Sequence, residues 1–205
     1  MSSKDPTLHS TLPVPPFAAA ERLQAIRQLR SARDVADLLQ ISFARLSYHL
    51  RDGSKAAYRR FHIPKKSGKP REIVAPVSAL KMIQRKLSDI LYEVYEPKAS
   101  VHGFVRERNI LSNARMHTRQ RWVLNLDLLD FFPSIHFGRV RGMFEGKFFG
   151  LNREVATTFA RICCFESSLP QGAPTSPIVS NLICARLDAE LRRVAKRNRC
   201  IYTRY

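Results

Sequence analysis

The fold of this chain is decided by one stretch of its sequence, Val123-Leu124-Asn125-Leu126-Asp127-Leu128-Leu129-Asp130-Phe131-Phe132-Pro133-Ser134-Ile135. Side chains alternate between the two faces of a strand, so Leu124, Leu126 and Leu128 would face one way while Asn125 and Asp127 face the other. We therefore predict a buried strand over residues 122–129 that presents a carboxylate opposite an apolar face. Carboxylate oxygens are suitable ligands for hard divalent cations, which makes Asp127 a candidate metal ligand. Asp130 is expected to shape the turn that follows.

A second stretch with candidate functional residues is Leu169-Pro170-Gln171-Gly172-Ala173-Pro174-Thr175-Ser176-Pro177. Gly172 allows the backbone to approach a ligand closely, and Gln171 offers a side-chain amide to a nucleotide or a base. Pro177 favours the first turn of a helix, and Ser176 is predicted to cap that helix. The apolar stripe expected along it consists of Ile178, Leu182, Ile183, Leu187, Leu191 and Val194.

The composition indicates a globular protein with a polyanionic partner. The chain has 205 residues, 44% of them hydrophobic, and 35 Lys and Arg against 17 Asp and Glu. Nucleic acid is the commonest partner for such a charge, and the alternative is a basic protein whose charge only keeps it soluble. The sequence contains no apolar run of about 18 residues and no secretory core, so we expect a cytoplasmic protein without membrane contact.

The N-terminal part is expected to be helical after a short extension. Residues 1–18 contain several prolines among Ser and Thr and are predicted to be flexible. Helical spacing of apolar residues, with breaks near Ser31 and Ser42, predicts two or three short helices in a region over residues 19–57. Residues 34–50 could also form a helix-turn-helix that enters a DNA groove, although any packed helical hairpin has the same spacing.

The next region combines a hairpin with an amphipathic helix. Two β-prone runs on either side of a basic, Gly-containing turn predict the hairpin, and the helix is expected after Pro76. Lys81 and Arg85 lie on the polar face of this helix, where they either contact a phosphate backbone or are only solvated. Further predicted elements are helices over residues 137–144 and 153–165 and a final strand from Cys200.

The two stretches above, together with Tyr202-Thr203-Arg204-Tyr205, resemble the palm of a reverse transcriptase, most closely the bacterial retron type. Asn113-Ala114-Arg115-Met116-His117 is similar to a retron-associated Asn-Ala-x-x-His segment, and His102-Gly103-Phe104 is also similar to retron sequences. The resemblance covers residues 33–205 in the order that the family has.

This resemblance implies an α+β, right-hand polymerase fold, with fingers over residues 58–121, a partial palm over residues 122–205 and no thumb. It implies an RNA-directed DNA polymerase, a nucleotidyltransferase that uses a structured noncoding RNA as template and primer. The implied partners are this RNA, the RNA–DNA hybrid, deoxynucleoside triphosphates and an effector protein, in antiviral defence against phage. The alternatives are a group II intron or other defence-associated reverse transcriptase, and a non-catalytic RNA-binding scaffold.

The same resemblance gives roles to individual residues. Two Mg²⁺ ions would catalyse phosphoryl transfer, with Asp127 and the backbone carbonyl of Leu128 among their ligands. Phe132 would collide with a ribose 2′-hydroxyl and so select deoxynucleotides. Lys65 and Arg71, at the hairpin turn, would bind the triphosphate, although other lysines of the turn compete with Lys65 for this role.

Two expectations concern RNA contacts and the end of the chain. His102 is expected to support the structure or to contact RNA, and Asn113 is expected to contact nucleic acid. Family members continue from the equivalent of Tyr205 into Ala-Asp-Asp, the rest of the palm and a thumb. We therefore expect a truncated enzyme in which Asp127 alone faces two cations, and no measurable polymerase activity from these 205 residues.

Overall fold

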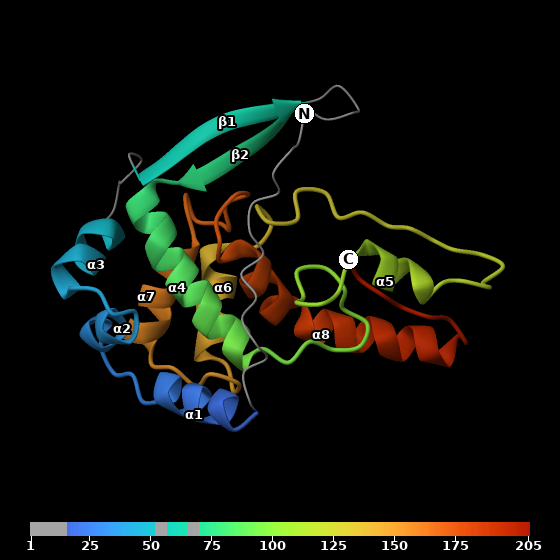
Figure 1. Cartoon of the computed structure of the whole chain (residues 1–205), viewed down its shortest axis with the longest axis horizontal. Coiled ribbons are helices and arrows are strands. Elements are labelled where there is room, and N and C mark those ends of the chain that lie inside the picture. Colours follow the sequence, from blue (N-terminus) through green and yellow to red (C-terminus); the bar gives the residue numbers. More distant parts are fainter. Residues whose placement is uncertain (1–15, 52–56, 65–69) are drawn as a thin grey trace, which may run out of the picture.

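The computed structural model describes residues 16–51, 57–64 and 70–205. It combines helices with a small sheet, which confirms the α+β class (Figure 1). The elements are α1 (Pro16–Arg27), α2 (Ala32–Leu38), α3 (Phe43–Leu50), β1 (Tyr58–Pro64), β2 (Pro70–Pro76), α4 (Ser78–Val94), α5 (Ile110–Arg115), α6 (Phe137–Glu145), α7 (Arg153–Cys163) and α8 (Ser176–Arg197). In this part of the chain, no helix is long and apolar enough to span a membrane.

Short helices form where the sequence predicted them in the N-terminal region. Ser31 caps α2 by accepting the Asp34 N–H, and the Asp34 carboxylate accepts the Ser31 N–H in return. Ser42 caps α3 by accepting the Arg45 N–H. The two serines that break the apolar pattern therefore start the next helix, because their hydroxyls satisfy backbone donors left free in a first turn.

The predicted hairpin is also present. β1 and β2 pair antiparallel, from Tyr58 opposite Pro76 to Pro64 opposite Pro70. The hairpin projects beyond the helices and leads directly into α4 (Figure 1).

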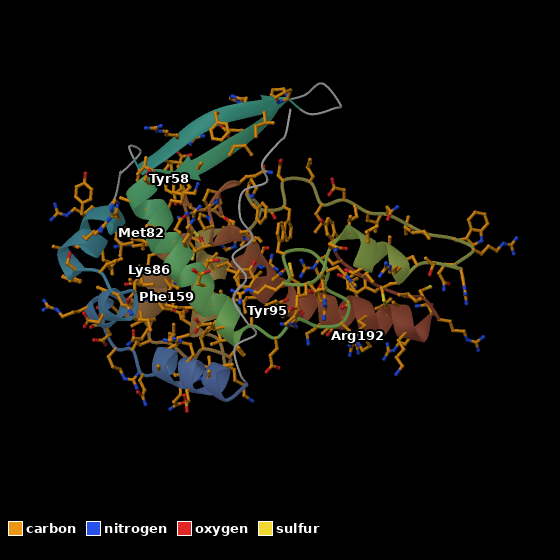
Figure 2. The ribbon with its side chains drawn as sticks, viewed as in Figure 1. Tyr58, Met82, Lys86, Tyr95, Phe159 and Arg192 are labelled. Carbon is orange, nitrogen blue, oxygen red and sulfur yellow. The ribbon has the colours of Figure 1, made fainter. Side chains whose placement is uncertain are left out.

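One hydrophobic core joins the helices around α4 and α7. α4 buries Leu80, Ile83, Leu87, Leu91 and Val94, the stripe that the sequence predicted. Phe159 of α7 is fully buried, and its ring lies 5.0 Å from that of Phe144 of α6 (Figure 2). Because α2, α3, α4 and α6 all contact α7, this helix anchors the core.

The strand predicted over residues 122–129 is wrong. These residues are extended but solvent-exposed, with exposed fractions of 83% for Trp122, 83% for Leu126 and 89% for Leu129. A strand needs a neighbour that exchanges main-chain hydrogen bonds with it, and among the described residues none pairs with this segment. The strand predicted from Cys200 is likewise reduced to one parallel bridge between Val101 and Arg204.

Two details of α8 also differ from the predictions. Thr175, not Ser176, occupies the N-cap, because the Ser176 hydroxyl donates to the Pro170 carbonyl at 2.7 Å instead. The predicted apolar stripe is buried only near the start of the helix, whereas Leu187, Leu191 and Val194 are exposed. The second half of α8 extends beyond the core, which leaves these three side chains between 39% and 49% exposed (Figure 1).

Candidate active site

The loop before α8 is fixed against the hairpin by its backbone. Val74 of β2 donates its N–H to the Gln171 carbonyl at 2.9 Å. Gly172 has a φ of +133°, and a Cβ there would lie 2.9 Å from Ile73 Cγ2 and 3.0 Å from the Val74 oxygen. Glycine is therefore required at this position, and the close approach that it permits is to β2.

A pocket of about 440 Å³ opens beside this loop. This central pocket is lined by Lys81, Arg85, Phe104, Phe132, Gly172, Ala173, Pro174, Ser176 and Pro177. Four of the residues predicted to form the site thus come together, Lys81 and Arg85 from α4 and Phe132 and Gly172 from two separate loops or turns. Cationic groups bind phosphate and aromatic rings stack on bases or sugars, so the pocket has the chemistry to hold a nucleotide or a strand of nucleic acid.

Phe104 is a member of this pocket that the sequence did not single out. Its ring centroid lies 6.0 Å from that of Phe132, and its backbone has a φ of +54°. Asn181 of α8 holds this backbone by donating from Nδ2 to the carbonyls of Gly103 at 3.1 Å and Phe104 at 3.2 Å. The only sequence signal was its place in the His-Gly-Phe segment, which carried no role for the ring.

The structure does not place Asp127 and Leu128 in the central pocket. Asp127 lies in the exposed extended segment, and Leu128 lines a separate pocket of about 170 Å³ beside α8. Asp130 has a φ of +47°, and its carbonyl accepts the Ser134 N–H at 2.9 Å, so it occupies the turn as expected. Gln171 is half-buried and is not among the residues that line the central pocket.

The donor set for a divalent cation is incomplete in the described residues. No group of three or more His, Cys, Asp and Glu side chains could hold a metal ion there. Asp127 and the Leu128 carbonyl could supply two oxygens, whereas Mg²⁺ demands an octahedral set of about six. The described residues therefore do not fit a two-ion site by themselves.

A buried ionic network at the end of the chain was not predicted. Asp188 of α8 is 1% exposed and accepts from Arg204 Nε at 2.9 Å, Arg204 Nη2 at 2.8 Å and the Tyr202 hydroxyl at 2.8 Å. Arg204 also donates from Nη1 to Asn181 Oδ1 at 2.9 Å, and its carbonyl accepts the His102 N–H at 2.7 Å. The network thus connects residues 202–204 with the Asn181 that holds the Phe104 backbone.

Burial and the neighbouring Asp188 carboxylate favour the protonated form of the Tyr202 hydroxyl. Burial raises the pKa of the Tyr202 hydroxyl, and its hydrogen bond to Asp188 raises that pKa further. The hydroxyl therefore stays protonated and donates to Asp188 throughout the physiological pH range.

His102 is buried beside α5, whereas Asn113 is a half-buried residue of α5 itself. His102 is 5% exposed, and its Nδ1 lies 2.9 Å from the Ser112 hydroxyl. Burial lowers the pKa of His102, and the charges of Arg108 and His117 lower it further. His102 Nε2 and Asn113 Oδ1 are buried without a hydrogen-bond partner in the described chain. The burial of His102 favours the supporting role, which was one of the two alternatives expected for it.

The predicted triphosphate ligands are only partly visible. Lys65 lies outside the described residues. The backbone of Arg71 pairs with Ile63 in the hairpin, and its side chain is not among those that the structure describes.

Comparison with known proteins decides the family. Residues 63–205 match the family model described as reverse transcriptase (RNA-dependent DNA polymerase). This chain belongs to the reverse transcriptase family. Among curated proteins it is similar to the retron Ec86 reverse transcriptase of Escherichia coli, with 39% identity over 151 residues that cover 72% of this chain and 46% of the relative.

Two relatives from Myxococcus xanthus extend the similarity over more of this reverse transcriptase. It is 33% identical to the retron Mx162 enzyme in an alignment of 214 positions, gaps included, which covers 94% of this chain and 44% of the relative. It is 36% identical to the retron Mx65 enzyme over 197 residues, which cover 86% and 46% of the two chains. The protein is therefore of the retron type, and it spans less than half the length of these curated relatives.

Proposed function

We propose that this chain forms the nucleotide-binding part of a retron-type RNA-directed DNA polymerase. In this proposal the hairpin and α4 belong to the fingers, and residues 122–205 belong to the palm. The observation that carries the proposal is the central pocket, because it joins two cationic side chains to two aromatic rings at the loop before α8. Family membership supports the same reaction class.

The pocket residues suggest a division of roles. Lys81 is half-buried and Arg85 is exposed, four residues apart on one face of α4, where their charges can bind successive phosphates. Phe132, braced by Phe104, would lie under the sugar and exclude a 2′-hydroxyl by its bulk. Lys65 and Arg71 would bind the triphosphate from the hairpin turn, and Gln171 would contact the nucleotide or the template base.

Nucleotide binding by the 205-residue chain tests this proposal directly. A fluorescent deoxynucleoside triphosphate should bind, and Lys81→Gln together with Arg85→Gln should weaken it at least about tenfold, since each charged hydrogen bond contributes about 1.5–3 kcal/mol. Phe132→Ala should reduce the preference for the deoxynucleotide over the matching ribonucleotide. Arg192→Gln with Lys196→Gln removes the same charge from exposed positions of α8 and serves as the control. Equal binding by both charge variants would contradict the proposal.

Catalysis requires more ligands than the described residues provide. Mg²⁺ is the cation that we propose for the polymerase reaction, with Asp127 and the Leu128 carbonyl among its ligands. Because no cluster of metal-ligating side chains is present in the described part of the chain, the chain alone should not extend a primer. Template-dependent incorporation of deoxynucleotides that Asp127→Ala abolishes would refute this expectation.

The wider role that we propose follows from the resemblance. A structured noncoding RNA would serve as template and primer in the cytoplasm, and an effector protein would couple DNA synthesis to defence against phage. Phage plating on hosts with and without the gene tests the defence role, and equal plaque numbers would contradict it. A non-catalytic RNA-binding scaffold remains the second candidate, favoured by the exposed position of Asp127.

A further inference from the structure

A groove of about 710 Å³ lies between α3 and α7, at the other end of the core from the exposed half of α8 (Figure 1). Each helix contributes three lining residues at four-residue spacing, so each set lies along one helix face. They are Phe43, Ser47 and Arg51 from α3 and its C-cap, and Arg153, Thr157 and Arg161 from α7. We call this surface the α3–α7 groove.

The α3–α7 groove carries more positive than negative charge, because Arg51, Arg153 and Arg161 line it together with a single carboxylate, Glu154. Arg153 and Arg161 are exposed, and neither forms an ion pair or a side-chain hydrogen bond with any residue that the structure describes. The groove also contains Glu154, whose Oε1 accepts the Ala32 N–H at 2.9 Å. Glu154 keeps its negative charge but forms no ion pair with either arginine among the described residues, so the two guanidinium groups remain available to an external anion.

We propose that the α3–α7 groove binds the phosphate backbone of RNA. Guanidinium groups and hydroxyls can all donate hydrogen bonds to phosphate oxygens, and both kinds recur along the groove. Arg153 and Arg161 are separated by about 12 Å along the helix at 1.5 Å per residue. By the rise of about 3.4 Å per nucleotide that duplex DNA has along its axis, this distance corresponds to three to four nucleotides, so the two guanidinium groups can contact different phosphates of one strand.

An exposed aromatic ring lies at the α3 side of the groove. Phe43 is 40% exposed, and the Arg33 guanidinium lies 5.2 Å from its ring centroid. A ring and a guanidinium stacked in this way offer a surface on which an unpaired base can stack, next to the cations that bind its backbone. The groove therefore has the arrangement of cations and aromatic groups that suits RNA.

This groove is a second contact surface, separate from the central pocket. The two share no lining residue, and the buried face of α7, with Phe159, packs into the core between α3 and α4. The choice of RNA as the occupant rests on the proposed function, whereas the phosphate chemistry rests on the groove itself. An RNA that reaches both surfaces would pass around the N-terminal helices.

RNA affinity and its salt dependence test this inference in the 205-residue chain. Each lost phosphate contact should lower the logarithmic salt slope by about 0.7–0.9, which is about five- to eightfold in affinity at about 0.1 M salt. For Arg153→Gln with Arg161→Gln we expect about 25- to 60-fold weaker binding of a fluorescein-labelled RNA hairpin by anisotropy, with the slope reduced by about 1.4–1.8. Arg153→Lys with Arg161→Lys keeps the charge and should retain most of the affinity.

The matched control is Arg192→Gln with Lys196→Gln on α8, on the other side of the molecule from α3 (Figure 2). It removes the same charge, so an equal loss of affinity in both variants would show diffuse attraction and overturn the inference. Thermal melting checks that both variants are folded, and ultraviolet crosslinking of a 4-thiouridine hairpin to the unaltered chain gives a second measurement. Crosslinks within residues 43–51 or 153–161 support the inference, and crosslinks confined to other segments overturn it.

These experiments distinguish failure of this inference from failure of the proposed function. If the double variant Arg153→Gln, Arg161→Gln binds both the nucleotide and the hairpin normally, only the proposal of RNA binding in the α3–α7 groove is overturned. No binding of the fluorescent deoxynucleotide or the hairpin by the unaltered chain would overturn both.

Discussion

Removing the Asp188 carboxylate should destabilise the protein more than any exposed charge substitution. Its side chain is 1% exposed, and that of its partner Arg204 is 13% exposed. Asp188→Ala leaves the guanidinium partly buried without its carboxylate and removes three hydrogen bonds. Breaking a buried ion pair by deleting one partner costs about 3–5 kcal/mol, because the remaining charge stays desolvated.

The same change should also release the last residues of the chain. Arg204 holds residues 100–103 through its backbone, since its N–H donates to the Ser100 carbonyl and its own carbonyl accepts from His102 and Gly103. If the ion pair anchors this segment, the His102 and Gly103 amides should exchange faster with solvent in Asp188→Ala. The free energy of local opening at these amides can then fall by nearly the full cost of the broken ion pair.

Urea denaturation and hydrogen exchange measure these two effects. A loss of about 3–5 kcal/mol in the free energy of unfolding corresponds to a fall in melting temperature of about 6–20 °C for a chain of this size. Asp89→Ala is the control, because Asp89 is exposed on α4 and should change stability by no more than about 0.5 kcal/mol. Comparing Asp188→Ala, Arg204→Ala and the double variant isolates the coupling between the two side chains.

Two results would refute this reasoning. One is a destabilisation by Asp188→Ala as small as that of Asp89→Ala. The other is additivity of Asp188→Ala and Arg204→Ala together with unchanged exchange at His102 and Gly103, since residues in one network should couple.

Two further predictions concern single residues. Gly172→Ala should lower the free energy of unfolding by about 1–3 kcal/mol, because the new Cβ would collide with Val74 and Ile73 and the backbone has a φ of +133°. Gly142→Ala is the control and should not lower it, because the space around its Cβ is open. Equal melting temperatures for the two variants would contradict this prediction. Burial lowers the pKa of His102 below the unfolded value of 6.5, so the unfolded state binds the proton more tightly and stability should fall as the pH drops below about 6.5. His102→Asn should reduce this acid-side loss in urea titrations at several pH values, and an unchanged pH dependence would show that His102 does not cause it.

Elements with a local signal could be predicted from the sequence. The apolar stripe of α4 is set by its own residues, and the β1–β2 hairpin needs only a short turn between two β-prone runs. Ser31 and Ser42 broke the apolar pattern at the positions where they cap helices. In each case the interaction that decides the structure joins residues close together in the chain.

Features that depend on distant partners could not be predicted in this way. The alternation around Asp127 was typical of a strand, yet an extended segment becomes a strand only when a neighbour pairs with it. Ser176 had the identity and position of a cap, but the Pro170 carbonyl competes for its hydroxyl. Asp188 sits among the polar residues of α8, and nothing near it in sequence signals the buried guanidinium of Arg204.

The residues of the candidate site show the same difference between local signals and distant partners. Lys81, Arg85, Phe132 and Gly172 were chosen from motifs and spacing, and packing of α4 against α8 and the hairpin brings them into one pocket. Asp127 was chosen from an equally good local pattern, but the segment that carries it has no partner strand among the described residues. The two proposed binding surfaces therefore depend on contacts that the helices make with each other, whereas a metal centre depends on several carboxylates that converge on one point. For this reason the nucleotide and RNA binding that we propose can be tested on the chain separately from catalysis, and failure of one proposal does not imply failure of the other.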